Sequence, residues 1–115
     1  MPLDKALVAG STALLLLKLL EEEDMYGYQM IEALAQRSND TFALKAGTLY
    51  PLLHDLEKQG AVKSYDGAAG GRRTRRYYGL TDGGRRLLAQ KKAAWEDYSQ
   101  AVNQVLKGGD AYALA

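Results

Sequence analysis

The last third of the chain carries an amphipathic pattern that is too long for a chain of 115 residues to bury by itself. A helical pattern runs from Thr81 to about Lys107, where Gly108 and Gly109 end it. Thr81 is a suitable N-cap, and Asp82 is favourable in the first turn of a helix. The large apolar side chains form one seam, made of Leu88, Trp95, Tyr98, Val102 and Val105. This seam predicts that the chain pairs with a second copy and that these residues lie in the dimer interface.

Shorter helical patterns precede this segment. The first spans about Asp4–Glu22, and its leucines imply burial on more than one side. The acidic run Glu21–Asp24 is unfavourable at the carboxyl end of a helix, so the helix is expected to stop there. The second spans Gly27–Arg37, and a polar loop follows it. The short apolar stretch Phe42–Leu44 is a candidate for one extended pairing.

A third short helix is predicted from Ala46 or Gly47 to Gln59, with Gly60 as its C-cap. Pro51 is expected near the first turn, where its missing N–H does least harm. One side of this helix is apolar and carries Leu49, Leu52, Leu53 and Leu56. The opposite side is small or polar, with Gly47, Pro51, His54 and Lys58, and with Tyr50 at its edge.

After the third helix the apolar period changes from helical to alternating. Val62–Tyr65 and Arg75–Leu80 are predicted to be two strands, with Tyr77 and Tyr78 on opposite faces. Between them lies a glycine-rich tip, residues 66–74, that ends in basic side chains.

The predicted order of three helices, a hairpin and a long helix is that of a winged helix-turn-helix protein. The fold class is therefore expected to be mainly α with a small β-hairpin (α+β). Residues 1–80 form the expected DNA-binding region, and residues 81–107 are the dimerisation helix of the same single domain. Residues 108–115 are expected to be a flexible tail.

The charges of the chain are unevenly distributed, although its net charge is only +1. Residues 1–57 carry 4 Lys and Arg against 9 Asp and Glu, whereas residues 58–92 carry 10 against 2. Residues 93–115 carry 1 against 3. A concentrated basic block in a nearly neutral chain favours a surface that binds a polyanion.

Several classes of function are excluded by what the sequence lacks. There are no cysteines, so disulfide scaffolds and thiolate sites are excluded, and the one histidine disfavours a metal site or a catalytic triad. No nucleophile–base pair or phosphate loop is present, so neither an enzyme nor a cofactor is expected. The apolar run Ala6–Leu20 is too short for a membrane span, and the acidic residues after it disfavour a signal peptide, so we expect a cytoplasmic protein.

Four motifs of the sequence, in this order, resemble the PadR-like transcriptional regulators. They are Tyr26-Gly27-Tyr28-Gln29, Gly47-Thr48-Leu49-Tyr50-Pro51-Leu52-Leu53, Leu56-Glu57-Lys58-Gln59-Gly60, and Gly70-Gly71-Arg72-Arg73 through Arg76-Tyr77-Tyr78-Gly79-Leu80-Thr81. The resemblance covers residues 8–106, and the single last helix is similar to the smaller subfamily. It implies a homodimer that binds a double-stranded operator of inverted symmetry and usually represses transcription.

The resemblance and the winged-helix geometry together define a candidate DNA-binding set. It consists of Tyr28, Gln29, Lys45, Gly47, Thr48, Tyr50, Pro51, His54, Lys58, Arg72, Arg73 and Arg75. Each of these residues could instead belong to a solvated face, and Thr48 and Tyr50 could serve as cap and packing residue. Of Arg75 and Arg76, one is expected to face away from DNA, because neighbours in a strand alternate.

The resemblance also implies a site for an effector at the centre of the dimer. Some small PadR-like regulators stack planar aromatic compounds between tryptophans of their last helices, which corresponds here to Trp95. Ala13, Leu14 and Ser99 would lie beside that ring. Aromatic stacking makes such a site suitable for a flat small molecule.

Two positions depart from the family pattern, and one alternative function stays open. Gly79 stands where relatives often have a larger polar residue, and Lys45-Ala46 stand where many have a Ser-Pro pair. The second departure lies at the start of the reading helix, so the operator sequence does not carry over. The alternative is a winged-helix module that binds an acidic protein partner without specific DNA binding.

Overall fold

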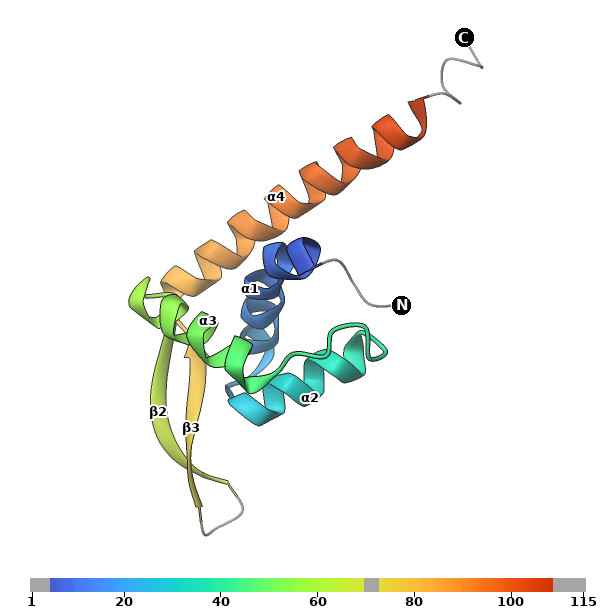
Figure 1. Ribbon diagram of the computed structural model, residues 1–115. Coiled ribbons are helices and arrows are strands. Elements are labelled where there is room, and N and C mark those ends of the chain that lie inside the picture. Colours follow the sequence, from blue (N-terminus) through green and yellow to red (C-terminus); the bar gives the residue numbers. More distant parts are fainter. Residues whose placement is uncertain (1–4, 70–72, 109–115) are drawn as a thin grey trace.

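The computed structural model describes residues 5–69 and 73–108, and the described chain is mainly α-helical with one small sheet. This confirms the predicted α+β class, with the element order of a winged helix (Figure 1). The elements are α1 (Lys5–Glu22), β1 (Met25–Tyr26), α2 (Gly27–Arg37), α3 (Ala46–Lys58), β2 (Val62–Ala69), β3 (Arg73–Leu80) and α4 (Asp82–Leu106). The predicted helix start at Asp4 and the predicted tail beyond residue 108 lie outside the described residues.

The sheet is antiparallel with the strand order β1-β3-β2. The strands of the hairpin are longer than predicted, because pairing continues from Val62↔Leu80 to Ala69↔Arg73. Most of the segment predicted as a tip therefore belongs to the strands. β1 was not predicted, because a strand of two residues has no alternating pattern to recognise.

The prediction of an extended pairing at Phe42–Leu44 was wrong, since this stretch forms no strand. Phe42 and Leu44 are instead half-buried and pack against the core. The backbone N–H of Phe42 donates to Ser38 Oγ at 2.9 Å, which holds the loop against the end of α2.

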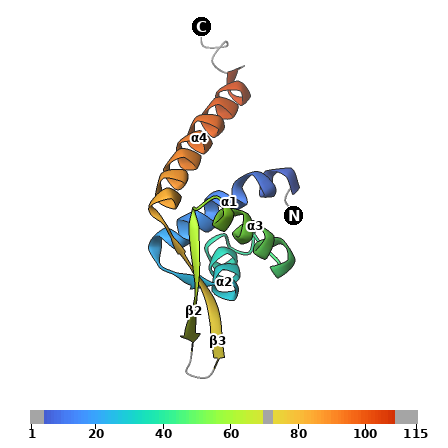
Figure 2. The same cartoon turned by 90° about the vertical axis from the view of Figure 1, so that its left-hand side faces the viewer.

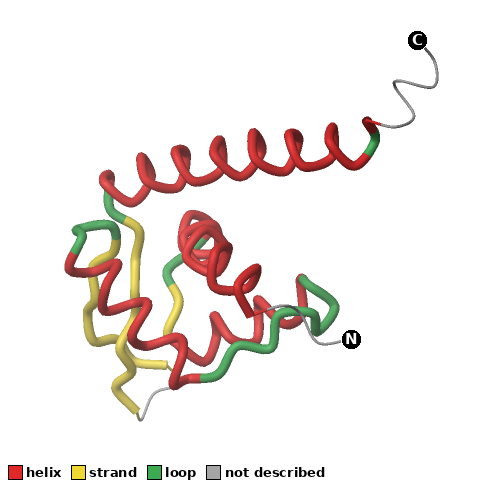
Figure 3. Tube along the Cα trace, turned by 45° about the horizontal axis from the view of Figure 1, so that its top comes forward, coloured by secondary structure: helices red, strands yellow, loops and turns green. Residues whose placement is uncertain are grey.

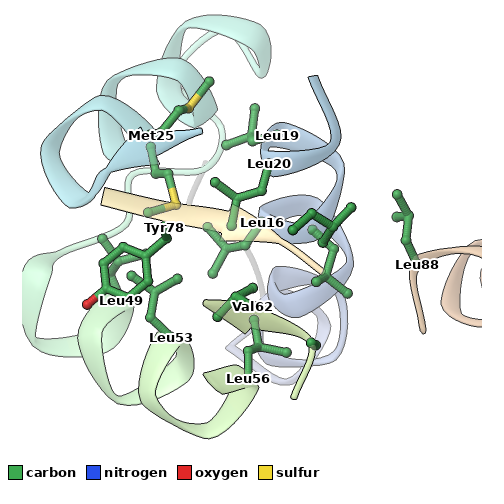
Figure 4. Packing of buried hydrophobic residues seen from close by; sticks show 14 of the residues in the cluster. Leu16, Leu19, Leu20, Met25, Leu49, Leu53, Leu56, Val62, Tyr78 and Leu88 are labelled. Carbon is green, nitrogen blue, oxygen red and sulfur yellow. The ribbon is translucent and has the colours of Figure 1, made fainter. Parts of the chain in front are cut away.

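The core is built around α1, whose Leu16 and Leu17 are fully buried. Leu49 and Leu53 of α3 and Tyr78 of β3 complete it (Figure 4). Tyr78 is buried whereas Tyr77 is half-exposed, which confirms that the two neighbours lie on opposite faces of the sheet. The body formed by α1, α2, α3 and the base of the hairpin is thus held together by leucines from all three helices.

α4 leaves this body and projects away from it, in the direction opposite to the hairpin (Figures 1 and 2). Only its first turns touch the body, where Leu88 is buried, and α1 lies between α4 and α2 (Figure 3). The radius of gyration is 17.2 Å, whereas a compact chain of this length has one of about 13 Å. The projecting half of α4 accounts for the difference.

Candidate nucleic-acid interface

The outer face of α3 is exposed along its whole length, whereas three leucines of its inner face are buried and Leu52 is half-buried. Leu49, Leu53 and Leu56 pack into the core with at most 2% of their surface exposed. The candidate DNA-binding residues at the start of α3 and along it are all exposed: Lys45, Gly47, Thr48, Tyr50, Pro51, His54 and Lys58. A single exposed helix with small and basic side chains has the dimensions that the major groove admits.

Pro51 lies in the second turn of α3 and not near the first, because the helix begins at Ala46. Its ring removes the N–H that would bond to the carbonyl of Gly47 one turn earlier. Both residues are exposed, so water can satisfy that carbonyl. The helix tolerates this proline because the missing bond lies on its outer face.

Tyr50 packs against the body of the protein and is also partly exposed. Packing was one of the two roles predicted for it. Its hydroxyl lies against Gly27, where there is no room for a Cβ. The ring nevertheless keeps 45% of its surface exposed. Tyr50 thus holds the N-terminal half of α3 against the start of α2 and presents its other edge outward.

The start of α2 places Tyr28 and Gln29 differently. Tyr28 is 60% exposed, so its ring and hydroxyl are accessible to a ligand. Gln29 is half-buried, and its Oε1 accepts a hydrogen bond from the backbone N–H of Tyr26 at 3.0 Å. The side-chain oxygen of Gln29 therefore caps α2. This role was not predicted from the sequence.

The arginines of the hairpin divide between its two faces. Arg76 lies on the face that meets α3, 3.9 Å from the carboxylate of Asp66. Arg75 lies on the other face, with its guanidinium 4.6 Å from the centre of the Tyr26 ring. Its Nε is buried without a hydrogen-bond partner in the described chain. Arg72 lies outside the described residues, and Arg73 is described only through its backbone pairing with Ala69.

The outer face of the sheet carries a row of three tyrosines. Tyr65 stacks on Tyr77 with ring centres 5.7 Å apart, and Tyr77 meets Tyr26 edge-on at 5.4 Å. Asp24, just after α1, closes the row, because its Oδ2 accepts a hydrogen bond from the Tyr65 hydroxyl at 2.5 Å. This bond raises the pKa of Tyr65 above its usual value. We call these four residues the tyrosine row; it links the hairpin to the start of α2.

Gly79 makes room for the carboxylate of Asp24. A Cβ at this position would lie 2.7 Å from Asp24 Oδ1, closer than normal contact. The departure of Gly79 from the family pattern therefore has a local physical reason. The tyrosine row could not be predicted from sequence patterns, since Asp24 and Tyr65 are 41 residues apart.

The apolar seam of α4 is exposed from Trp95 onward. Trp95, Tyr98 and Val105 are 49%, 60% and 80% exposed, and Val102 is also exposed. Leu88 differs from the prediction, because it is 4% exposed and belongs to the core of its own chain. Leu106, four residues after Val102, is 76% exposed and was missed, although its spacing fits the seam.

The residues predicted around an effector lie on α1 and on α4, two helices that contact each other. Ala13 and Leu14 of α1 are half-buried and pack against the core, and α1 contacts α4. Trp95 lies 6.4 Å from Tyr98, measured between ring centres, and Ser99 donates to the carbonyl of Glu96 at 3.2 Å. Trp95 and Tyr98 therefore form an exposed pair of aromatic rings on α4.

Within residues 5–69 and 73–108, no group of three or more His, Asp or Glu side chains is placed to hold a metal ion. The same part of the chain has no helix with the length and apolar character of a membrane span.

Comparison with known proteins finds similarity to transcriptional regulators. Residues 16–90 match the family model described as the transcriptional regulator PadR-like family. A transcriptional regulator of Mycobacterium tuberculosis is 31% identical over 81 residues, covering 70% of this chain and 72% of that protein. The structure of a transcriptional regulator from Clostridium thermocellum has a TM-score of 0.81 at 31% identity, covering 87% of this chain and 97% of that chain. A PadR family transcription regulator from Eggerthella lenta has a TM-score of 0.78 at 34% identity, covering 89% and 87%.

Proposed function

Because the chain belongs to the PadR-like family of transcriptional regulators, we propose that it is a repressor that binds an inverted-repeat operator as a homodimer. Members of this family are non-enzymatic regulators, and the proposal assigns this chain no catalytic step. Its site of action is the cytoplasm, beside the chromosome. Residues 1–80 are the reading part of the protein, and residues 81–107 are the pairing part.

The exposed outer face of α3 is the observation that carries the proposal. Its inner leucines are buried, so the helix is held rigidly while Thr48, His54 and Lys58 face outward. Base edges in the major groove are read by such side chains, and lysines neutralise the phosphates around them. The basic hairpin beside α3 supplies further phosphate contacts through Arg72 and Arg73.

The exposed seam of α4 supports the homodimer. Trp95, Tyr98, Val102 and Val105 are large apolar residues that the described part of the chain leaves exposed. A second copy of the same seam is the simplest cover, because a twofold interface is self-complementary. Two copies of α4 then set the distance between two reading helices, and an inverted repeat has that symmetry.

The effector site is the second part of the proposal. Trp95 and its partner copy would hold a planar aromatic compound between them, with Ala13, Leu14 and Ser99 at the edge of the site. Binding there would change how the two copies of α4 pair and would lower the affinity for the operator. The compound can shift the equilibrium between the two arrangements of the dimer only by as much as its affinities for them differ.

The proposal is tested by selecting binders from a pool of random duplex DNA and measuring their affinity at several salt concentrations. We expect enrichment of an inverted repeat and a steep loss of affinity with salt, as for proteins that contact several phosphates. Weak binding without any enriched sequence would contradict the proposal. That result would favour the alternative of a module that docks an acidic protein partner.

A matched pair of variants tests the hairpin. Replacing Arg72 and Arg73 with Ala should weaken binding to all DNA sequences about equally and reduce the salt dependence. Replacing Arg85 and Arg86 with Ala, which makes the same change of net charge at the start of α4, should have a much smaller effect. Equal effects of the two double variants would remove the hairpin from the interface.

The effector site has a direct readout because Trp95 is the single tryptophan of the chain. Titration with a planar dye such as acridine orange should quench the tryptophan fluorescence and reduce operator binding. Trp95→Ala should abolish the effect of the dye on operator binding, whereas Trp95→Phe should retain part of it. A full response in Trp95→Ala would place any effector elsewhere.

A further inference from the structure

The end of α3 and the start of α4 meet in a small hydrogen-bonded unit, although 21 residues separate them in the sequence. α3 ends at Lys58. The turn after it contains Gly60, whose φ of +78° is the left-handed conformation that favours glycine. The backbone N–H of Ala61 donates back to the carbonyl of Leu56 at 2.9 Å, which closes the last turn. The turn after α3 is therefore rigid, and its next carbonyls are available to other partners.

Thr81 uses those carbonyls. Its Oγ1 donates to the carbonyl of Gly60 at 2.6 Å, and its backbone N–H donates to the carbonyl of Ala61 at 3.1 Å. The same Oγ1 accepts the N–H of Gly84 at 2.9 Å and so caps α4. One side chain thus bonds the end of the reading helix and the first turn of the pairing helix at the same time.

The glycines after Thr81 let α4 approach this turn closely. A Cβ at Gly84 would overlap the carbonyl oxygen of Ala61 and lie 2.6 Å from Leu80 Cδ1. A Cβ at Gly83 would lie 3.2 Å from the carbonyl oxygen of Gly60. The first turn of α4 therefore rests directly on the backbone after α3, as Figure 1 shows at the start of α4.

We propose that this unit, the Thr81 joint (Gly60, Ala61, Thr81, Gly83 and Gly84), determines which spacing of operator half-sites the dimer accepts. The inference rests on the proposed function as a dimeric DNA-binding protein. In the described chain, α4 is almost entirely exposed from Trp95 onward, so the angle between α4 and the body depends on the joint together with the packing of α1 on the first turns of α4. In the dimer, that angle sets how far apart the two copies of α3 lie.

The geometry makes the spacing sensitive to this angle. The 13 residues of α3 extend about 20 Å from the joint back to Ala46 at a rise of 1.5 Å per residue. A rotation of about 10° at the joint therefore moves the start of α3 by about 4 Å, which is close to the rise of one base pair. A loosened joint should make the dimer tolerate operators whose half-sites are moved by one base pair.

The joint itself can be tested without DNA. The chain has no cysteines, so cysteines introduced at the exposed Asp55 of α3 and Gln104 of α4 are unique attachment points for spin labels. Labelled chains are mixed with an excess of unlabelled chains, so that most of the dimers that contain label carry one label pair. We expect a narrow distance distribution in the parent and in Thr81→Ser, which keeps the hydroxyl, and a clearly broader one in Thr81→Ala.

The consequence for DNA is tested with three versions of the selected operator, which have the preferred spacer or a spacer one base pair shorter or longer. Loss of an N-cap hydroxyl costs about a factor of five in an equilibrium constant. Thr81→Ala should therefore reduce the preference for the correct spacer about fivefold, and Thr81→Ser should retain it. Lower thermal stability without any change in spacer preference would mean that Thr81 is only a helix cap, and would overturn the proposal.

Gly84→Ala provides a second variant that acts by a different route. Its Cβ must push α4 away from Ala61, so the mean label distance and the preferred spacer should both shift. Gly10→Ala, where a Cβ meets nothing within 4 Å, is the control and should change neither.

The outcomes separate the two proposals. If the parent selects no DNA, the proposed function fails and the label distances alone decide whether the joint exists. Unchanged distances in both Thr81→Ala and Gly84→Ala would overturn the joint, even in a protein that binds DNA as proposed.

Discussion

At the scale of single residues, Gly79 shows how a missing side chain can position another. A Cβ there would meet Asp24 Oδ1 at 2.7 Å, so we expect Gly79→Ala to displace the carboxylate and destabilise the fold by about 1 kcal/mol. Urea unfolding at neutral pH measures this. Gly10→Ala should have the opposite sign, because a Cβ there meets nothing within 4 Å and alanine loses less conformational entropy than glycine in a helix. A stabilised Gly79→Ala would show that the carboxylate moves away at no cost.

Tyr65 gives a prediction about alkaline pH. Its hydrogen bond to Asp24 raises the pKa of the phenol in the folded state. The corresponding contribution to stability is fully present below the unfolded pKa of about 10 and is lost as the pH rises through the folded value. Tyr65→Phe should therefore show a smaller loss of stability than the parent above pH 10. Identical alkaline profiles in urea unfolding would show that the bond is not kept in solution.

Some residue positions could be predicted from the sequence and others could not. The exposed face of α3 followed from helical periodicity, because Leu49, Leu53 and Leu56 can be buried only on one side. Leu88 was assigned to the free seam because periodicity does not show where α4 leaves the body. Contacts between distant residues, such as Asp24 with Tyr65 or Tyr50 with Gly27, leave no periodic pattern in a single sequence.

At the scale of elements, helices were predicted better than strands for a physical reason. Helical patterns repeat over many residues, whereas β1 has two residues and exists only because β3 offers it an edge. The hairpin strands extend to Ala69 and from Arg73 because each pairs with the other. That stretch is rich in glycine and alanine, which is typical of a loop, so it is not recognised as a strand unless the partner strand is known.

The exposed part of α4 should show concentration-dependent hydrogen exchange. Residues 95–106 are almost entirely exposed in the single chain, so their amide hydrogens are protected there only by a helix that lacks tertiary support. Hydrogen exchange in this segment should slow as the protein concentration rises and dimers form, whereas exchange in the buried part of α3 should not change. Exchange that is independent of concentration throughout the segment would contradict pairing through α4.

At the scale of the whole molecule, the protein is a reading body joined to a projecting arm. The body buries its leucines within one chain, so it can hold α3 in place without a partner. The arm extends the molecule to 66 Å in its longest dimension and contributes little to the core. From this separation we predict that the proposed DNA binding and the proposed pairing can be removed independently, by variants of α3 or of the exposed part of α4.

Val102→Glu tests that separation. The charge would lie within the seam, where burial without a partner costs about 3 kcal/mol, equivalent to more than 100-fold in the dimer dissociation constant. Gln104→Glu adds the same charge to a neighbouring exposed position outside the seam and should leave the dimer intact. Sedimentation equilibrium measures the assembly, and binding to full operators and single half-sites measures the consequence. We expect Val102→Glu to bind half-sites as the parent does but to lose the gain from the second half-site, because that gain comes only from joining two bodies. Equal losses on both DNAs would mean that α4 supports the reading body itself.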